Sequence, residues 1–207
     1  TVYASLTATA NNTPVAFEQG VIVLHYAPLV AANGTGIYNY YVSTGSLPAG
    51  LILNSSTGII SGTPSASGSS TFYIGVQDSY NVTATTVATI TATIYSPITA
   101  TANTAVQLTE VGQATANFQP LTASSGTGSY TYIATALTPL PPGLSINSTT
   151  GVVSGTPTSS SFGTGTVVFK VTDSAGGTAV TTSAVNYTVY PTITATATTT
   201  AQNLEVG

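Results

Sequence analysis

The five acidic side chains are the residues of this chain best suited to chemistry. A carboxylate pair facing one cleft could cleave a glycosidic bond. However, all five recur at matching positions of a repeat. One position, just before the glycine that closes the opening strand, is occupied by Glu18, Glu110 and Glu205. The other, in a turn after a strand, is occupied by Asp78 and Asp173. An aspartate in such a turn bonds its own backbone a few residues on. We interpret all five acids as structural residues, and we expect no catalytic site and no enzyme.

His25 and Lys170 are the only histidine and the only basic residue. His25 could act as a general base for a serine, but the sequence lacks the Gly-x-Ser-x-Gly motif. We expect it to point outward from a strand or to bond the backbone. Lys170 could form an isopeptide crosslink if it were buried beside a carboxylate. It lies between the core-facing Phe169 and Val171, so we expect its side chain to point to solvent.

No metal and no cofactor is expected. Zinc needs several ligands from His, Cys or carboxylates, and calcium needs clustered acids, whereas no two acids here lie within five residues of each other. The chain has no cysteine, which also excludes disulfides. Nucleic acid is excluded as a partner, because binding to phosphates requires several basic residues.

Two pairs of tyrosines recur at matching positions, Tyr38 with Tyr40 and Tyr130 with Tyr132. Each pair shares one face of a strand, so it could stack against a sugar. Core lining or cross-strand packing is the more common use of repeated aromatic residues, and we favour that interpretation.

Six asparagines stand in the Asn-x-Ser/Thr pattern that accepts N-linked glycans. They are Asn11, Asn33, Asn54, Asn81, Asn147 and Asn186. Several fall in predicted turns, where a glycan could project. Asn54 and Asn147 also begin matching turns, so a structural role fits these two equally well. We expect glycans to be partners of this chain.

Composition predicts an all-β protein with a surface of hydroxyl groups. Charged residues make up 3% of the chain, while Thr and Ser together fill about a third of it. Thr, Val, Ile and Tyr favour pleated sheets. The longest apolar stretch, from Val21 to Ala32, is too short to cross a bilayer. Together with the glycan acceptor sites, this surface favours an extracellular position at the cell surface, and we expect Thr1 to begin a processed, mature chain.

An internal repeat divides the chain into two bodies. Leu-Pro-x-Gly-Leu at 47–51 returns at 140–144, Asn-Ser-x-Thr-Gly at 54–58 returns at 147–151, and Ser-Gly-Thr-Pro at 61–64 returns at 154–157. Opening segments containing Thr-Ala-Thr-Ala occur near residues 6–10, 98–102 and 193–197. Three opening segments serve two bodies, so one is surplus. The predicted organisation is a first domain over 1–95, a second over 96–190 and a surplus strand over 191–207.

Short strands separated by turn signals predict a β-sandwich in each body. The expected strands of the first body are residues 4–10, 21–26, 37–43, 51–53, 58–61, 71–77 and 82–94. Those of the second are residues 97–108, 115–121, 129–135, 144–146, 152–154, 165–172 and 178–190.

The repeated motifs, together with Val-x-Asp-Ser at 76–79 and 171–174, resemble the Putative-Ig repeat family of bacterial and archaeal surface proteins. The resemblance covers nearly the whole chain, twice and in order. It implies two tandem immunoglobulin-like (Ig-like) or cadherin-like Greek-key sandwiches and no chemistry of their own.

The surplus segment suggests how such a chain could assemble. Two bodies with an extra strand resemble fibres in which one subunit lends a strand to its neighbour, which is called donor-strand complementation. The composition resembles surface proteins of acid-loving thermophilic archaea, among them the subunits of thread filaments. We expect the subunit of a pilus-like filament, whose partners are copies of itself and whose donor strand presents Ile193, Ala195 and Ala197. The alternative is a spacer or adhesin module of a longer repeat protein.

Overall fold

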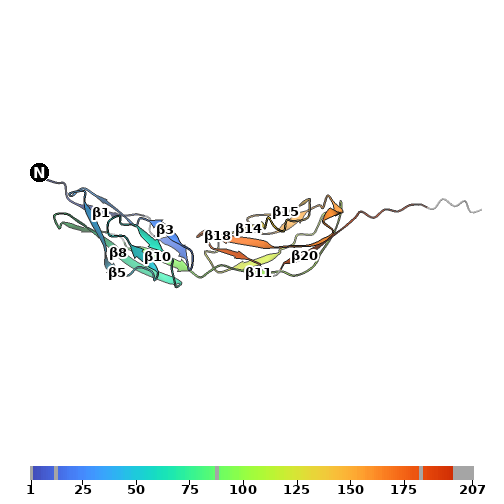
Figure 1. The fold of residues 1–207 in the computed structure, drawn as a ribbon, viewed down its shortest axis with the longest axis horizontal. Helices are drawn as coiled ribbons and strands as arrows, with labels where there is room; N and C mark the ends of the chain where they lie inside the picture. Colours follow the sequence, from blue (N-terminus) through green and yellow to red (C-terminus); the bar gives the residue numbers. More distant parts are fainter. Residues whose placement is uncertain (1, 12–13, 87–88, 182–183, 198–207) are drawn as a thin grey trace, which may run out of the picture.

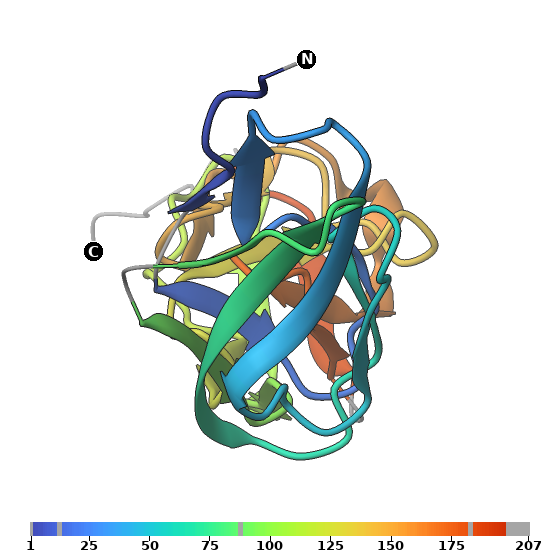
Figure 2. The ribbon, with the colours of Figure 1, turned by 90° about the vertical axis from the view of Figure 1, so that its left-hand side faces the viewer.

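The computed structural model describes residues 2–11, 14–86, 89–181 and 184–197. Two bodies made of β-strands lie end to end in a rod, and the C-terminal segment continues beyond the second body along the same direction (Figure 1). Seen end-on, much of the second body lies behind the first (Figure 2).

Body one contains ten strands among its described residues. They are β1 (Thr7–Ala10), β2 (Val15–Glu18), β3 (Val23–Tyr26), β4 (Leu29–Ala32), β5 (Tyr38–Gly45), β6 (Leu51–Leu53), β7 (Ile60–Gly62), β8 (Gly68–Asp78), β9 (Thr83–Thr85) and β10 (Ile90–Tyr95). The main sheet has the order β2-β10-β8-β5, with β9 also paired to β8, while β3-β7-β6 and β1-β4 form smaller sheets. The pair β2–β10 is parallel, and all the others are antiparallel.

Body two repeats most of this arrangement, but in place of β3, where a strand was expected over 115–121, it has a single bridge between Phe118 and Val153. Its strands are β11 (Thr99–Ala102), β12 (Gln107–Glu110), β13 (Leu121–Ser124), β14 (Tyr130–Ala134), β15 (Leu144–Ile146), β16 (Val153–Gly155), β17 (Thr164–Val167), β18 (Phe169–Asp173), β19 (Thr178–Val180) and β20 (Val185–Tyr190), with a 3-10 turn, η1 (Ser160–Phe162). β11 pairs with β13 as β1 pairs with β4, and β12 runs parallel to β20 as β2 does to β10. The long strand β8 is replaced by β17 and β18, since the pairing is interrupted at Val168.

Alternation of side chains between two faces builds a separate core in each body. In β8, Phe72, Ile74 and Val76 are buried, and in β20 the same is true of Val185, Tyr187 and Val189. The buried residues form two distinct clusters, one in each body. The prediction of an all-β chain with two sandwich bodies is confirmed.

Two strands of body one were not expected from the sequence. They are β2 and β4, and each covers four residues. Glu18 ends β2 rather than the opening strand, so the glycine at position 20 does not close that strand. The broad predicted strands over 82–94, 97–108 and 178–190 each correspond to two shorter strands. Four-residue strands depend on partners distant in the sequence, which periodicity within a short window does not reveal.

Candidate functional site at the joint between the bodies

Asp78 holds the turn that connects β8 to β9. Its Oδ1 accepts hydrogen bonds from the backbone N–H groups of Tyr80 and Val82, both at 3.0 Å, and its Oδ2 accepts one from Thr35 N–H at 3.3 Å. Asp173 makes the same bonds in body two, from Ala175, Gly177 and Thr127, at 3.0, 2.9 and 2.8 Å. The interpretation of both aspartates as turn residues is confirmed.

Glu18 joins body one to body two, and its side chain is only 2% exposed. Its Oε1 accepts a hydrogen bond from Ile98 N–H at 2.6 Å, at the point where the chain enters body two. Its carboxyl group also lies against the turn that follows Asp173, close to the Asp173 carboxyl group. Because a Cβ atom at Gly177 would overlap the Glu18 carboxyl group, this contact requires a glycine there. We call this set of contacts the joint.

The pKa values of the two acids in the joint are shifted in opposite directions. Burial raises the pKa of Glu18, and the neighbouring Asp173 raises it further. The hydrogen bond from the Ile98 N–H acts in the opposite direction and lowers this pKa. Burial also favours the neutral form of Asp173, but hydrogen bonds from Thr127, Gly177 and Glu18 prevail and lower the pKa of Asp173. Glu18 Oε2 is buried and accepts no bond from the described donors. Two carboxyl groups can bond each other only through a proton, and the raised pKa of Glu18 makes Glu18 the acid that we expect to hold it.

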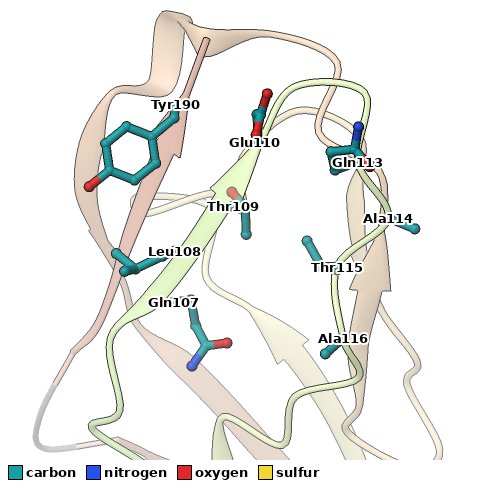
Figure 3. Close-up of a pocket in the computed structure, with 9 residues that line it drawn as sticks. All are labelled: Gln107, Leu108, Thr109, Glu110, Gln113, Ala114, Thr115, Ala116 and Tyr190. Carbon is teal, nitrogen blue, oxygen red and sulfur yellow. The ribbon is translucent and has the colours of Figure 1, made fainter. Parts of the chain in front are cut away.

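The far end of body two carries a similar arrangement around Glu110, and no further body contacts it among the described residues. Glu110 Oε1 accepts a hydrogen bond from Ile193 N–H at 3.0 Å, and Thr192 Oγ1 donates to Val111 O at 3.4 Å. A hollow of about 380 Å³ lies beside Glu110 (Figure 3). It is lined by Gln107, Leu108, Thr109, Glu110, Gln113, Ala114, Thr115, Ala116 and Tyr190.

The corresponding hollow of body one contacts body two. It has a volume of about 210 Å³ and is lined by Phe17, Glu18, Val21, Ile22, Val23, Leu24, His25 and Ala175. Ala175 belongs to the turn of body two that also holds Gly177. The end of body one that faces body two, which we call its trailing end, thus contacts the turn after Asp173. We call this turn, at the end of body two that faces body one, the leading turn of body two.

The single histidine and lysine lie as expected. His25 is an exposed residue of β3. Lys170 in β18 is only half-buried, while Phe169 and Val171 on either side are fully buried on the opposite face. Among the described residues, no group of three potential metal ligands comes together.

The recurring tyrosines pack within their own bodies. The rings of Tyr38 and Tyr40 meet edge to face at 6.2 Å, as do those of Tyr130 and Tyr132. The hydroxyl groups of Tyr38 and Tyr130 donate to backbone carbonyls five residues earlier. All four rings belong to or pack against the cores. The interpretation as core lining therefore fits the geometry.

The six glycan acceptor asparagines are all exposed, but they differ in their surroundings. The Oδ1 atoms of Asn54 and Asn147 each accept two backbone N–H bonds, so both residues hold turns. Asn33 and Asn81 have left-handed backbones, with φ of 65° and 63°. Asn11 Nδ2 donates to Ala27 O. Asn186 is an exposed residue of β20.

The donor-strand residues are exposed, and the segment belongs to no strand. Ile193 is 82% exposed, and Ala195 and Ala197 are also exposed. The remainder of the surplus segment, residues 198–207 with Glu205, lies outside the described residues. The sequence analysis had not foreseen that Glu18 connects two bodies. Its recurrence near the start of each repeat was the available signal, but its partner in the second body becomes evident only in three dimensions.

Two tandem Ig-like sandwiches, joined through a buried carboxyl group, define an Ig-like repeat protein. The chain belongs to the Putative Ig domain family, which matches residues 1–95 and 94–192. Among solved structures, the insect immune protein hemolin is similar at 12% identity with a TM-score of 0.51, covering 91% of this chain and 50% of hemolin. An endo-fucoidan hydrolase of glycoside hydrolase family 107 is also similar, at 18% identity with a TM-score of 0.41, covering 86% of this chain and 32% of that one.

Among curated proteins, the chain is similar to the serine-rich adhesin for platelets of Staphylococcus aureus strain MRSA252. The two are 32% identical over 154 residues, which cover 72% of this chain and 10% of the adhesin. In the adhesin of strain MSSA476 the same match covers 6%. The chain therefore spans a small part of the length of these relatives. Within the described residues, no helix is both long and apolar enough to cross a membrane.

Proposed function

We propose that the chain is a non-enzymatic, rod-forming segment of an extracellular fibre at the cell surface, in which residues 193–197 form the opening strand of the Ig-like body that follows. The family membership and the similarity to part of a staphylococcal adhesin support a surface role. The rod in Figure 1 suits a part that spans distance rather than one that encloses a substrate.

The observation that carries the proposal is the correspondence between two chain segments. Ile98 precedes β11, and its amide is bound by Glu18, while Ile193 has the same relation to Glu110. Residues 194–197 read Thr-Ala-Thr-Ala, as β1 and β11 do. In β11 the threonines face outward and the alanines are half-buried. An exposed segment with this pattern matches a strand awaiting a partner sheet.

A second copy of the chain can supply that sheet. In body one, β1 pairs with β4 through Thr7, Ala8, Thr9 and Ala10. Residues 194–197 would replace these four without altering a single side chain, and Ile193 would take the place of the buried Leu6. This supports a filament joined by donor-strand complementation, with copies of the chain as partners and N-linked glycans on its surface.

A following domain of the same polypeptide is the second candidate. β1 and β11 each pair within their own body, so the described residues leave no empty position for a donated strand. Donor-strand exchange would have to displace β1. This favours a spacer or adhesin module in a longer row of Ig-like domains.

Assembly of the purified chain distinguishes the two candidates. The full chain should form filaments visible by electron microscopy if strands are donated, and a chain ending at Tyr190 should remain a folded monomer. Ala195→Asp should prevent filaments, because it places a charge on the core-facing side, whereas Thr196→Asp adds the same charge on the outer side and should leave them intact. A full chain that remains monomeric at high concentration would contradict strand donation and leave the spacer.

A further inference from the structure

We propose that the trailing end of body two, which carries Glu110 and Ile193, accepts a following Ig-like body only if that body has a glycine four residues after its turn aspartate. The inference rests on the proposed opening strand and deepens the proposed function, since it specifies which body can follow. It favours the second candidate, a following domain with a glycine at this position, over an unaltered copy of body one. The partner is an Ig-like domain with the turn chemistry of body two.

The joint between the two bodies shows why this glycine matters. Gly177 lies four residues after Asp173, and an added Cβ would overlap the Glu18 carboxyl group. Its backbone does not have a positive φ, so conformational freedom does not explain the glycine. The glycine is explained instead by the space that the missing Cβ leaves for the Glu18 carboxyl group.

The trailing end of body two presents the same requirement. Glu110 bonds Ile193 N–H in the way that Glu18 bonds Ile98 N–H. The side chains around it are smaller or more polar, with Gln113, Ala114, Thr115 and Ala116 in place of the run from Val21 to Leu24. The neighbouring hollow therefore leaves room for a larger residue two positions after the aspartate of the partner (Figure 3).

Body one does not meet the requirement in its natural form. Its leading turn makes the same aspartate bonds, but the position four residues after Asp78 is Val82, which is 48% exposed. The Val82 side chain would occupy the space that Glu110 needs. Tyr80, two residues after Asp78, corresponds to Ala175, and in such a joint it would lie beside the larger hollow. Val82 would therefore obstruct placing body one behind body two.

Substitutions in the natural chain test the glycine requirement directly. Gly177→Val should displace Glu18 and speed hydrogen exchange of the Ile98 amide about tenfold, because that amide loses its acceptor. The matched control, Val82→Gly, alters the turn of body one that lies away from the joint and should leave this rate unchanged. Glu18→Ala should itself speed the exchange, and adding Gly177→Val to it should cause no further change. An unchanged rate in Gly177→Val would overturn the proposal.

A tandem chain tests the partner rule at the second joint. Residues 1–192 are fused to residues 6–207 of a second copy, so that Leu6 takes the position of Ile193. With Val82 in the second copy, the amide of this Leu6 should exchange about as fast as an unbonded amide, and Val82→Gly in that copy should slow it about tenfold. Equal protection in both tandems would overturn the inference.

These measurements separate the inference from the proposed function. The Gly177→Val result concerns a joint inside one chain and is independent of assembly. If the natural chain forms strand-donated filaments in which Glu110 binds the next copy despite Val82, the proposed function stands and the glycine rule fails. If residues 193–197 of the natural full chain remain unprotected from hydrogen exchange even when it is assembled at high concentration, the proposed opening strand itself is wrong.

Discussion

At the scale of single residues, Glu18 and Asp173 place two carboxyl groups together in a chain that has five acidic residues in all. Such a pair costs stability unless a proton lies between the groups and other donors surround them. The Ile98, Thr127 and Gly177 N–H groups supply those donors. The arrangement turns a destabilising pair into a specific contact between domains.

The joint should be strongest in mildly acidic solution. The pKa of Glu18 is raised above its ordinary 4.5, so its contribution is complete below that value and is lost as pH rises through the raised pKa. The pKa of Asp173 is lowered below 3.8, so its contribution is lost as pH falls through the lowered value. We expect the Ile98 amide to exchange most slowly near pH 4, after correction for the intrinsic rate.

A variant provides the control for this pH dependence. Glu18→Gln removes the titration of Glu18 but keeps a side chain of similar shape. Because Asp173 stays ionised above its lowered pKa, the corrected exchange rate should be flat from about pH 4 upward. With few other titrating groups, the melting temperature of each body should change little with pH. A natural chain whose corrected exchange is equally fast at pH 4 and pH 7 would contradict the shared proton.

At the scale of elements, a tyrosine ring packs over a turn glycine in each body. An added Cβ at Gly58 would lie 2.8 Å from Tyr40 Cε1, and at Gly151 it would lie 2.9 Å from Tyr132 Cδ1. Both glycines also have left-handed backbones, with φ of 72° and 73°. The repeated Asn-Ser-x-Thr-Gly motif thus fixes a turn and clears space for a ring.

Gly58→Ala should destabilise body one by about 1–3 kcal/mol, because the new methyl group meets both a strained backbone and the Tyr40 ring. Chemical denaturation of the chain measures the change. Gly20→Ala is the matched control, since Gly20 has φ of 82° but open space around it. The loss at Gly20 should be smaller, and equal losses would mean that the ring contact contributes nothing.

The sequence predicted the elements whose signals are local. The strand Leu51–Leu53 agrees with its expected bounds, and Phe169 and Val171 of β18, predicted to face the core, are buried. β2 and β4 were missed because a short strand such as Val15–Glu18 forms through a parallel partner far along the chain. Glu18 was assigned to a structural position, but its contact with Gly177 depends on how two domains meet, which no local pattern encodes.

At the scale of the whole molecule, the rod exposes hydroxyl groups and very few charges. With one basic and five acidic residues in 207, electrostatic repulsion between molecules is weak. The six acceptor asparagines are exposed and distributed over both bodies. Glycans at these positions would keep neighbouring rods apart sterically.

We therefore expect at least three of the six sites to carry glycans in the native source. Asn33, Asn81 and Asn186 are exposed and hold no turn through the hydrogen bonds described above, so they are the favoured positions. Peptide mapping by mass spectrometry measures the occupancy of each site. Unmodified asparagine at all six positions would reject the expectation and weaken the cell-surface assignment.

The parallel pairing of β12 with β20 determines how body two responds to tension. A pull along the rod leaves body two through Tyr190, at the end of β20, where four residue pairs connect it to β12. Because the strands lie side by side along the direction of pull, their hydrogen bonds must break together rather than one after another. Body one ends in the same way through β10 and β2. Each body is thus built to resist mechanical extension, which suits a tether exposed to flow.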